Sequence, residues 1–169
     1  MEYTTAGEKE YMEGMELLNS QVTFNLRKAM ECFKSAAEQG HEEAMFQVGW
    51  LYLYGFPQIQ PNAKKAKEYF EKASETGGVL ACHNLALMYF GGIGGERNLE
   101  KALDYAKKAF EGGYFREASF LCDAYLYGWG TEINMEKAKE YNSCARNMGL
   151  QNAESKYVEI NFSNLCNCV

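Results

Sequence analysis

Small and hydrophobic side chains recur along this chain at helical spacing, in blocks separated by glycine-rich stretches. The pattern Asn-x-x-Lys-Ala occurs four times, as Asn25–Ala29, Asn62–Ala66, Asn98–Ala102 and Asn134–Ala138. In each copy a Cys or Tyr follows the Ala by three residues, an Ala by seven and a Gly by eleven. This spacing places the apolar side chains on one face of an α-helix. Asn is a favoured N-cap and Gly a favoured end residue, so each copy predicts one helix, called here a B helix.

A second helix, called an A helix, is predicted before each B helix. In the last three units a Tyr and a Gly stand 12 and 15 residues after the glycine that ends the preceding B helix: Tyr52 and Gly55, Tyr89 and Gly92, Tyr125 and Gly128. Four residues before each Tyr is a Val or Leu, followed by Gly49, Ala86 or Cys122, small residues that predict close helix contact. In the first unit the A helix is predicted near Glu8–Leu18.

The units predict an α-solenoid, because isolated helix pairs of this kind leave an apolar face uncovered until they stack. We expect one domain over 1–169, with units at about 6–40, 41–77, 78–113 and 114–149. Ala153, Tyr157 and Val158 predict a capping helix within 150–169, followed by a tail over 161–169. Seven glycines are predicted to end helices: 40, 55, 77, 92, 113, 128 and 149. Six tyrosines are predicted to form a core ladder: 52, 69, 89, 105, 125 and 141.

Two stretches resemble Sel-one-like repeats (SLR), relatives of the tetratricopeptide repeat, and the resemblance covers nearly the whole chain. They are Val48–Gly55, which reads VGWLYLYG, and Lys28–Ala44, which contains KA, then AAEQGHEEA. The step of 36–37 residues favours SLR over the 34-residue tetratricopeptide repeat. One departure is Glu117, which stands in unit four where the preceding units have Ala. The resemblance implies an all-α, right-handed α-α superhelix of about four helix pairs, acting as a scaffold or adaptor without chemistry of its own.

The partner-binding positions follow by analogy with the tetratricopeptide repeat, in which A helices line the concave face. The predicted positions are Phe46, Trp50, Leu53, Tyr54, His83, Leu87, Phe90, Asp123, Leu126 and Tyr127. Their aromatic character predicts a concave groove that binds a helix or an extended peptide of another protein. The alternative is that several of them, Phe46, Leu53 and Leu87 first, pack between adjacent A helices.

Composition and charge argue against several classes of protein. The 169 residues are 47% hydrophobic and 14% aromatic, which excludes a disordered chain. With 17 basic and 23 acidic residues the formal charge is −6, which argues against nucleic-acid binding. No apolar run is long enough to span a bilayer and the N-terminal residues have no signal-peptide pattern. We therefore expect a cytoplasmic monomer that binds neither nucleic acid nor membrane. Mixed charges such as Lys64, Lys65 and Glu68 predict a solvated outer face on the B helices.

The sequence offers no catalytic, cofactor or metal site. The two histidines, His41 and His83, lack zinc-ligand spacing, and His41 is predicted to be a solvated turn residue. His83 neighbours Cys82, but adjacent helix positions point about 100° apart and form no Cys–His dyad. A hydrolase of β-lactamase type, as labelled in cysteine-rich relatives, remains the alternative, although S-x-x-K and K-T-G are absent. An immunity protein against a secreted toxin is a further alternative.

The six cysteines are irregularly spaced, and four of them, Cys32, Cys82, Cys122 and Cys144, fall in helical patterns. We expect reduced thiols in the core, because free cysteine behaves as a small buried hydrophobe. Cys166 and Cys168 belong to the tail, where their spacing suits neither prenylation nor a tetrahedral metal site.

Overall fold

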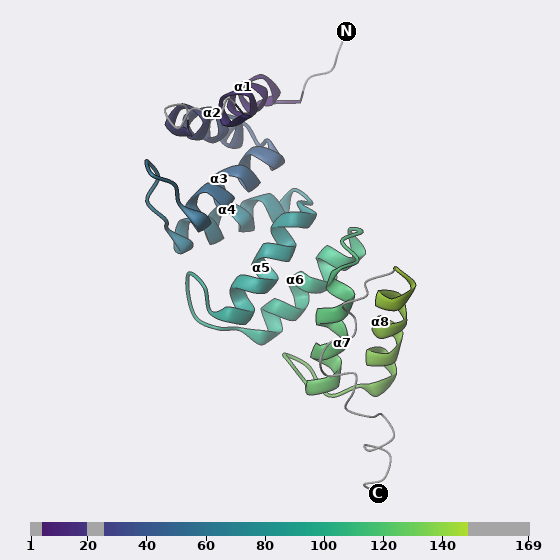
Figure 1. Cartoon of the computed structure of the whole chain (residues 1–169). Helices are drawn as coiled ribbons and strands as arrows, with labels where there is room; N and C mark the ends of the chain where they lie inside the picture. The colour runs from purple at the N-terminus through teal and green to yellow at the C-terminus, as the bar shows by residue number, and fades with distance from the viewer. Residues whose placement is uncertain (1–4, 20–25, 149–169) are drawn as a thin grey trace, which may run out of the picture.

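The computed structural model describes residues 5–19 and 26–148, and within these ranges it contains eight α-helices and no strand (Figure 1). The helices are α1 (Glu8–Asn19), α2 (Leu26–Glu38), α3 (Glu42–Tyr54), α4 (Ala63–Glu75), α5 (Val79–Gly91), α6 (Leu99–Glu111), α7 (Glu117–Tyr127) and α8 (Met135–Asn147). The odd-numbered helices are the A helices and the even-numbered ones the B helices. The cap at Asn25, the glycine at 149, the capping helix and the cysteines of the tail lie outside the described residues.

The helices form an all-α solenoid, as predicted. Each A helix packs antiparallel to the B helix that follows it, and α2, α4 and α6 also contact the A helix of the next pair (Figure 1). The predicted first A helix is present as α1, and α7 begins at Glu117, the position at which unit four departs from the Ala of earlier units. The regular succession of pairs places α3, α5 and α7, the predicted partner-binding helices, at equivalent positions in the array.

The repeated Asn joins the two helices of each of the last three pairs. The Asn98 side-chain oxygen accepts a hydrogen bond from the backbone N–H of Lys101 at 2.9 Å, which caps α6. The backbone N–H of Asn98 donates to the carbonyl oxygen of Tyr89, near the end of α5, at 2.9 Å. The same two bonds recur at Asn62 and Asn134. In the last three pairs one residue type therefore begins the B helix and fixes it to the last turn of its A helix.

The predicted glycines end the helices in the left-handed backbone region. Six of them have φ between 68° and 105°: glycines 40, 55, 77, 92, 113 and 128. A side chain at such φ values is strained, so glycine is favoured at these positions. The backbone N–H of Gly92, for example, bonds to the carbonyl of Met88 one turn earlier in α5.

Glycines also permit close approach inside two helix pairs. Gly49 on α3 faces Phe70 on α4, as the small residue in the A-helix pattern predicted. Gly14 on α1 faces Phe33 on α2 in the same manner, and an added Cβ would lie 2.6 Å from the Phe33 ring. Gly14 thus holds in α1 the position of Gly49 in α3. The sequence reading missed this equivalence because the first A helix shares no other motif residue with the rest.

The tyrosine ladder consists of three stacked pairs, one in each of the last three units. Their ring centroids lie 5.6–6.0 Å apart: Tyr52 with Tyr69, Tyr89 with Tyr105, and Tyr125 with Tyr141. Only Tyr89 and Tyr125 are buried, so the ladder follows the edge of the core. Lysines of the B helices cover the rings; Lys67 Nζ, for instance, lies 3.7 Å from the Tyr89 centroid. The predicted solvated charges therefore include ammonium groups in cation–π contacts.

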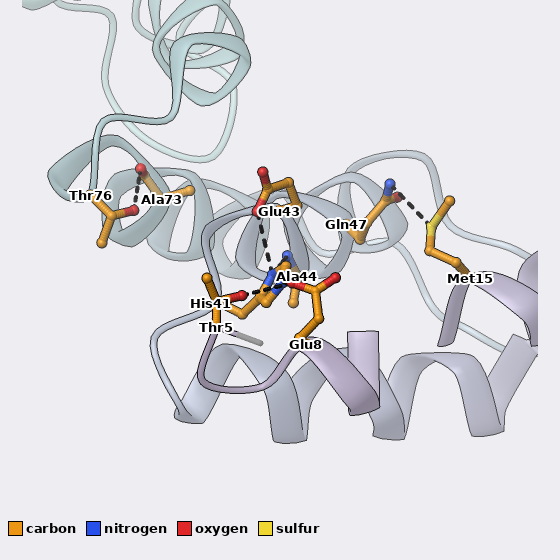
Figure 2. A network of polar contacts seen from close by, with 9 residues as sticks. All are labelled: Thr5, Glu8, Met15, His41, Glu43, Ala44, Gln47, Ala73 and Thr76. Atoms are coloured by element: carbon orange, nitrogen blue, oxygen red, sulfur yellow. Dashed lines mark hydrogen bonds and ion pairs between the residues drawn. The ribbon is translucent and has the colours of Figure 1, made fainter. Parts of the chain in front are cut away.

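The prediction for His41 is wrong. The residue is only 6% exposed, and its ring stacks on that of Tyr11 with centroids 4.5 Å apart. Its Nδ1 accepts a hydrogen bond from the backbone N–H of Ala44 and so caps α3. Its Nε2 lies 3.3 Å from a carboxylate oxygen of Glu8 on α1 (Figure 2). Residues 8 and 41 meet only when α1 and α3 converge, and a local pattern does not encode that contact.

The described cysteines agree with reduced core thiols. Cys82 and Cys122 are buried, while Cys32 and Cys144 are half-buried, and all four are free. Burial raises the pKa of the Cys122 thiol to about 11 and also raises the pKa of Cys82. These thiols are therefore protonated at neutral pH and poor nucleophiles.

Candidate functional site

The ten predicted partner-binding residues all retain exposed surface. Tyr54, Leu87 and Tyr127 are 63%, 47% and 38% exposed, and the remaining seven are half-buried. They lie on α3, α5 and α7, whose helical starts and ends are set by the caps and glycines described above. The structure gathers some of these side chains into two aromatic clusters and places others in different surroundings.

The first cluster belongs to α3 and the loop that follows it. The Trp50 ring lies 5.1 Å from that of Tyr54 and 5.6 Å from that of Phe56, centroid to centroid. We call Trp50, Tyr54 and Phe56 the α3 cluster. Phe56 was not among the predicted residues, because it lies beyond the helix whose positions the tetratricopeptide analogy supplies.

The second cluster joins two successive A helices. Phe90 on α5 lies 5.4 Å from Phe120 on α7 and 4.9 Å from Trp129 in the loop after α7. Tyr127 lies 5.7 Å from Trp129, and the Arg97 guanidinium stands 5.1 Å over the Phe90 ring. We call Phe90, Phe120, Tyr127 and Trp129 the α5–α7 cluster.

The sequence reading missed two of these four residues, Phe120 and Trp129. The signal for Trp129 is its place between Gly128 and Gly130, which have φ of 72° and 69° and turn the chain back toward α5. A Cβ on Gly130 would lie 2.3 Å from the Leu99 carbonyl oxygen, so this turn is held against α6.

Five of the predicted residues pack against buried core residues: Phe46, Trp50, Leu53, Phe90 and Leu126. Phe46 contacts Phe70 of α4 with ring centroids 5.6 Å apart, and Leu53 packs against the central core. Leu126 packs against a small buried group that includes Cys122 and Tyr125. Leu87, in contrast, is nearly half exposed. Phe46 and Leu53 therefore fit the alternative of packing between helices better than Leu87 does.

His83 is engaged within the protein. Its Nδ1 contacts the carboxylate of Glu117, the first residue of α7, and its ring lies 4.6 Å from that of Tyr114. The Glu117 side chain is only 4% exposed, and the His83 side chain is 25% exposed. A buried carboxylate in place of the usual Ala therefore connects α7 to α5, and His83 remains partly exposed.

Asp123 adds a charge beside the aromatic face. It occupies in α7 the register position that Trp50 has in α3, and its side chain is half-buried. Burial raises the pKa of this carboxyl above its ordinary value. It makes no ion pair with any residue of 5–19 or 26–148, so its oxygens remain available for a donor from outside.

The described part of the chain contains neither a metal-binding cluster nor a membrane-spanning helix. No group of three or more His, Cys, Asp or Glu side chains within it has the geometry to hold a metal ion. None of its helices has the length and apolar character required to cross a membrane.

Comparison with known families finds one match. The model of the Sel1 repeat matches residues 11–41, 42–77, 79–114 and 118–150. These ranges cover most of the chain. A search of curated proteins finds no match.

Several solved structures are similar to this chain. A Sel1 repeat protein from Oxalobacter formigenes is 25% identical with a TM-score of 0.82, over 88% of this chain and 61% of that protein. A protective antigen of uropathogenic Escherichia coli strains, displaying an SLR fold, is 25% identical with a TM-score of 0.77. The match covers 86% of this chain and 31% of that protein. The chain therefore spans less than two thirds of either relative. Helicobacter pylori cysteine rich protein B, at 20% identity and a TM-score of 0.55 over 69% of this chain and 98% of that protein, shares the fold alone.

Proposed function

Because the chain belongs to the Sel1 repeat family, whose repeats generally mediate protein–protein interactions, we propose that it is a non-enzymatic scaffold that binds a polypeptide across α3, α5 and α7. The α5–α7 cluster is the observation that supports this proposal most. Its rings come from two successive A helices and a loop, and Tyr127 remains 38% exposed. Partly exposed Trp and Tyr side chains that are already packed together lose little entropy on binding, which is typical of interface anchors.

The chemistry of this face specifies the kind of partner segment. Leu87 and the two aromatic clusters would take apolar side chains from a helix or an extended peptide. The Asp123 carboxylate lies on the same helix as Tyr127 and forms no ion pair with a described residue, so it would receive a lysine, an arginine or a backbone N–H of the partner. We therefore propose a partner segment that is apolar and carries a donor group.

The hydrolase alternative gains no support from the described histidines and buried thiols. His41 uses both ring nitrogens inside the protein, and His83 is bound to Glu117. Burial raises the pKa of the Cys82 and Cys122 thiols, which is opposite to what a nucleophile requires. Family membership favours the scaffold.

The test combines Trp50→Ala with Tyr127→Ala, one residue from each aromatic cluster. A partner is first captured from lysate of the source organism, identified by mass spectrometry and purified. We expect its affinity for the double variant to fall at least about tenfold, since truncating an interface anchor costs about 2 kcal/mol or more. Far-ultraviolet circular dichroism checks that the variant keeps its helices.

The matched control is Phe115→Ala. Phe115 is 44% exposed but lies before α7, where it contacts Phe110 and neither aromatic cluster. Its loss is expected to leave the affinity within about twofold of the wild type. If the folded Trp50/Tyr127 double variant bound the partner with unchanged affinity, the proposal that this face binds the partner would be contradicted.

A further inference from the structure

A pocket of about 320 Å³ lies between α2, the end of α3 and the loop over 55–62. Its walls include three basic side chains, Arg27, Lys34 and Lys65, and one aromatic ring, Tyr52. The proposed function uses none of these four residues.

The pocket carries a local excess of positive charge. Arg27, Lys34 and Lys65 contribute three cations, and Glu31 is the acidic residue among the described lining side chains. None of the three cations forms an ion pair with a described residue, although the chain as a whole has a formal charge of −6. The whole protein has more acidic than basic residues, so this group of cations without carboxylate partners is a local exception. Its positive potential favours the binding of an external anion.

The two lysines lie near the same aromatic ring. Lys34 on α2 and Lys65 on α4 each place Nζ 5.4 Å from the centroid of the Tyr52 ring. They approach this ring from two successive B helices, so both ammonium groups lie near one ring beside one opening. Met30 and Ile59 line the pocket and are 5% and 7% exposed.

The remaining wall is a loop with a fixed conformation. Phe56 and Ile59 exchange two backbone hydrogen bonds, at 2.9 and 2.8 Å, and the Asn62 N–H donates to the Tyr52 carbonyl at 2.7 Å. Pro61 packs against Gly55, where an added Cβ would lie 2.9 Å from the proline Cδ. Because the loop is ordered before any ligand arrives, binding would not carry the cost of ordering it.

We propose that this pocket binds an acidic side chain of a partner peptide, with its carboxylate held by Lys34 and Lys65. The proposal rests on the proposed function, because the acid would belong to the same polypeptide partner. An acidic segment docked here would fix the orientation of the partner along the solenoid, since charge complementarity determines register more than affinity. The amide side chains of Gln58 and Gln60 line the same pocket and provide additional donors.

The experiment uses the full chain labelled with ¹⁵N and an acetylated, amidated hexaglutamate peptide. We expect saturable amide shifts concentrated at Tyr52, Gln58 and Asn62. The double variant Lys34→Ala, Lys65→Ala should bind the peptide at least about tenfold more weakly, as expected when two charge-assisted contacts are lost. An uncharged hexaglutamine peptide should produce no saturable shifts.

The matched control is the double variant Lys28→Ala, Lys64→Ala, which makes the same charge change on the same two helices outside the pocket. Equal weakening by the two double variants would overturn the proposal, and so would shifts spread over the whole surface. Binding of a phosphoserine peptide or of inorganic phosphate about tenfold tighter than hexaglutamate would overturn the assignment to a carboxylate. Because this test contains no natural partner, its failure leaves the Trp50/Tyr127 test of the aromatic face unaffected.

Discussion

Gly49 on α3 packs against Phe70 on α4 so closely that a Cβ on residue 49 would lie 2.7 Å from Phe70 Cε1. Phe70 is fully buried, and its ring also contacts Phe46 on α3. The absence of a side chain at position 49 therefore determines how near the two helices of this pair approach. The same relationship at Gly14 and Phe33 indicates that it is a feature of the first two pairs.

Gly49→Ala is expected to destabilise the protein in urea unfolding. Overpacking a buried site costs about 1–3 kcal/mol, and the better helix propensity of Ala offsets up to about 1 kcal/mol of that. Gly91→Ala is the control, because Gly91 ends α5 and its Cβ would meet only the Ile93 side chain, at 3.3 Å. That variant should stay within about 0.5 kcal/mol of the wild type. If both variants had the same stability, the close approach at Gly49 would not matter.

Tyr89→Phe tests the hydrogen bond between the A helix of unit three and the preceding B helix. The Tyr89 hydroxyl donates to a Glu71 carboxylate oxygen at 2.7 Å, and Tyr89 is 5% exposed. Loss of this bond should cost about 1 kcal/mol, measured by chemical unfolding. Tyr54→Phe, at a residue 63% exposed, should change the free energy of unfolding by less than about 0.5 kcal/mol.

The same tyrosine gives a prediction at alkaline pH. Burial and the hydrogen bond to Glu71 raise the Tyr89 pKa well above its ordinary value of 10.0. Above pH 10.0 the unfolded tyrosine ionises while the folded one stays neutral, so the wild type should lose stability as the pH rises. Tyr89→Phe should show a shallower loss over that range. Parallel curves for the two proteins would contradict the assignment.

Glu8→Gln tests the contact between α1 and α3. Hydrogen bonds from Thr5 and from His41 hold the Glu8 pKa below its ordinary value of 4.5. The ionised carboxylate therefore stabilises the fold above pH 4.5, and this contribution disappears as the pH falls through the lowered folded value. Glu8→Gln should be less stable than the wild type at neutral pH, and the two should converge in acid. Glu16→Gln, the same charge change at an exposed position of α1, should show no such convergence.

Asp123→Asn should raise the melting temperature at neutral pH. Burial raises the pKa of the Asp123 carboxyl, so its ionised form destabilises the fold above the folded pKa and this penalty is relieved as the pH falls. The gain of the variant should therefore shrink in acid. Asp104→Asn, at an exposed position of α6, should leave the melting temperature unchanged. If Asp123 receives a donor from the partner, the stabilised variant should also bind that partner more weakly.

The sequence predicted the helices well because their limits depend on neighbouring residues. Asn98 caps α6 through the N–H three residues on, and Gly92 ends α5 by adopting φ of 69°. Both effects act within about one helical turn, so a repeated motif is sufficient to locate them. The candidate face was predicted less completely, because the tetratricopeptide analogy covers A-helix positions and supplies neither Phe56 nor Trp129 from the loops.

The sequence by itself therefore determined the number of helix pairs over the described residues, the caps and the glycine ends. Only the tertiary structure decided which distant residues meet. It buried His41 against Tyr11 and Glu8, brought Phe90 to Trp129, and placed Lys34 and Lys65 over the Tyr52 ring. The reason is physical: these contacts depend on the angle and distance between successive helices, which packing over the whole array determines.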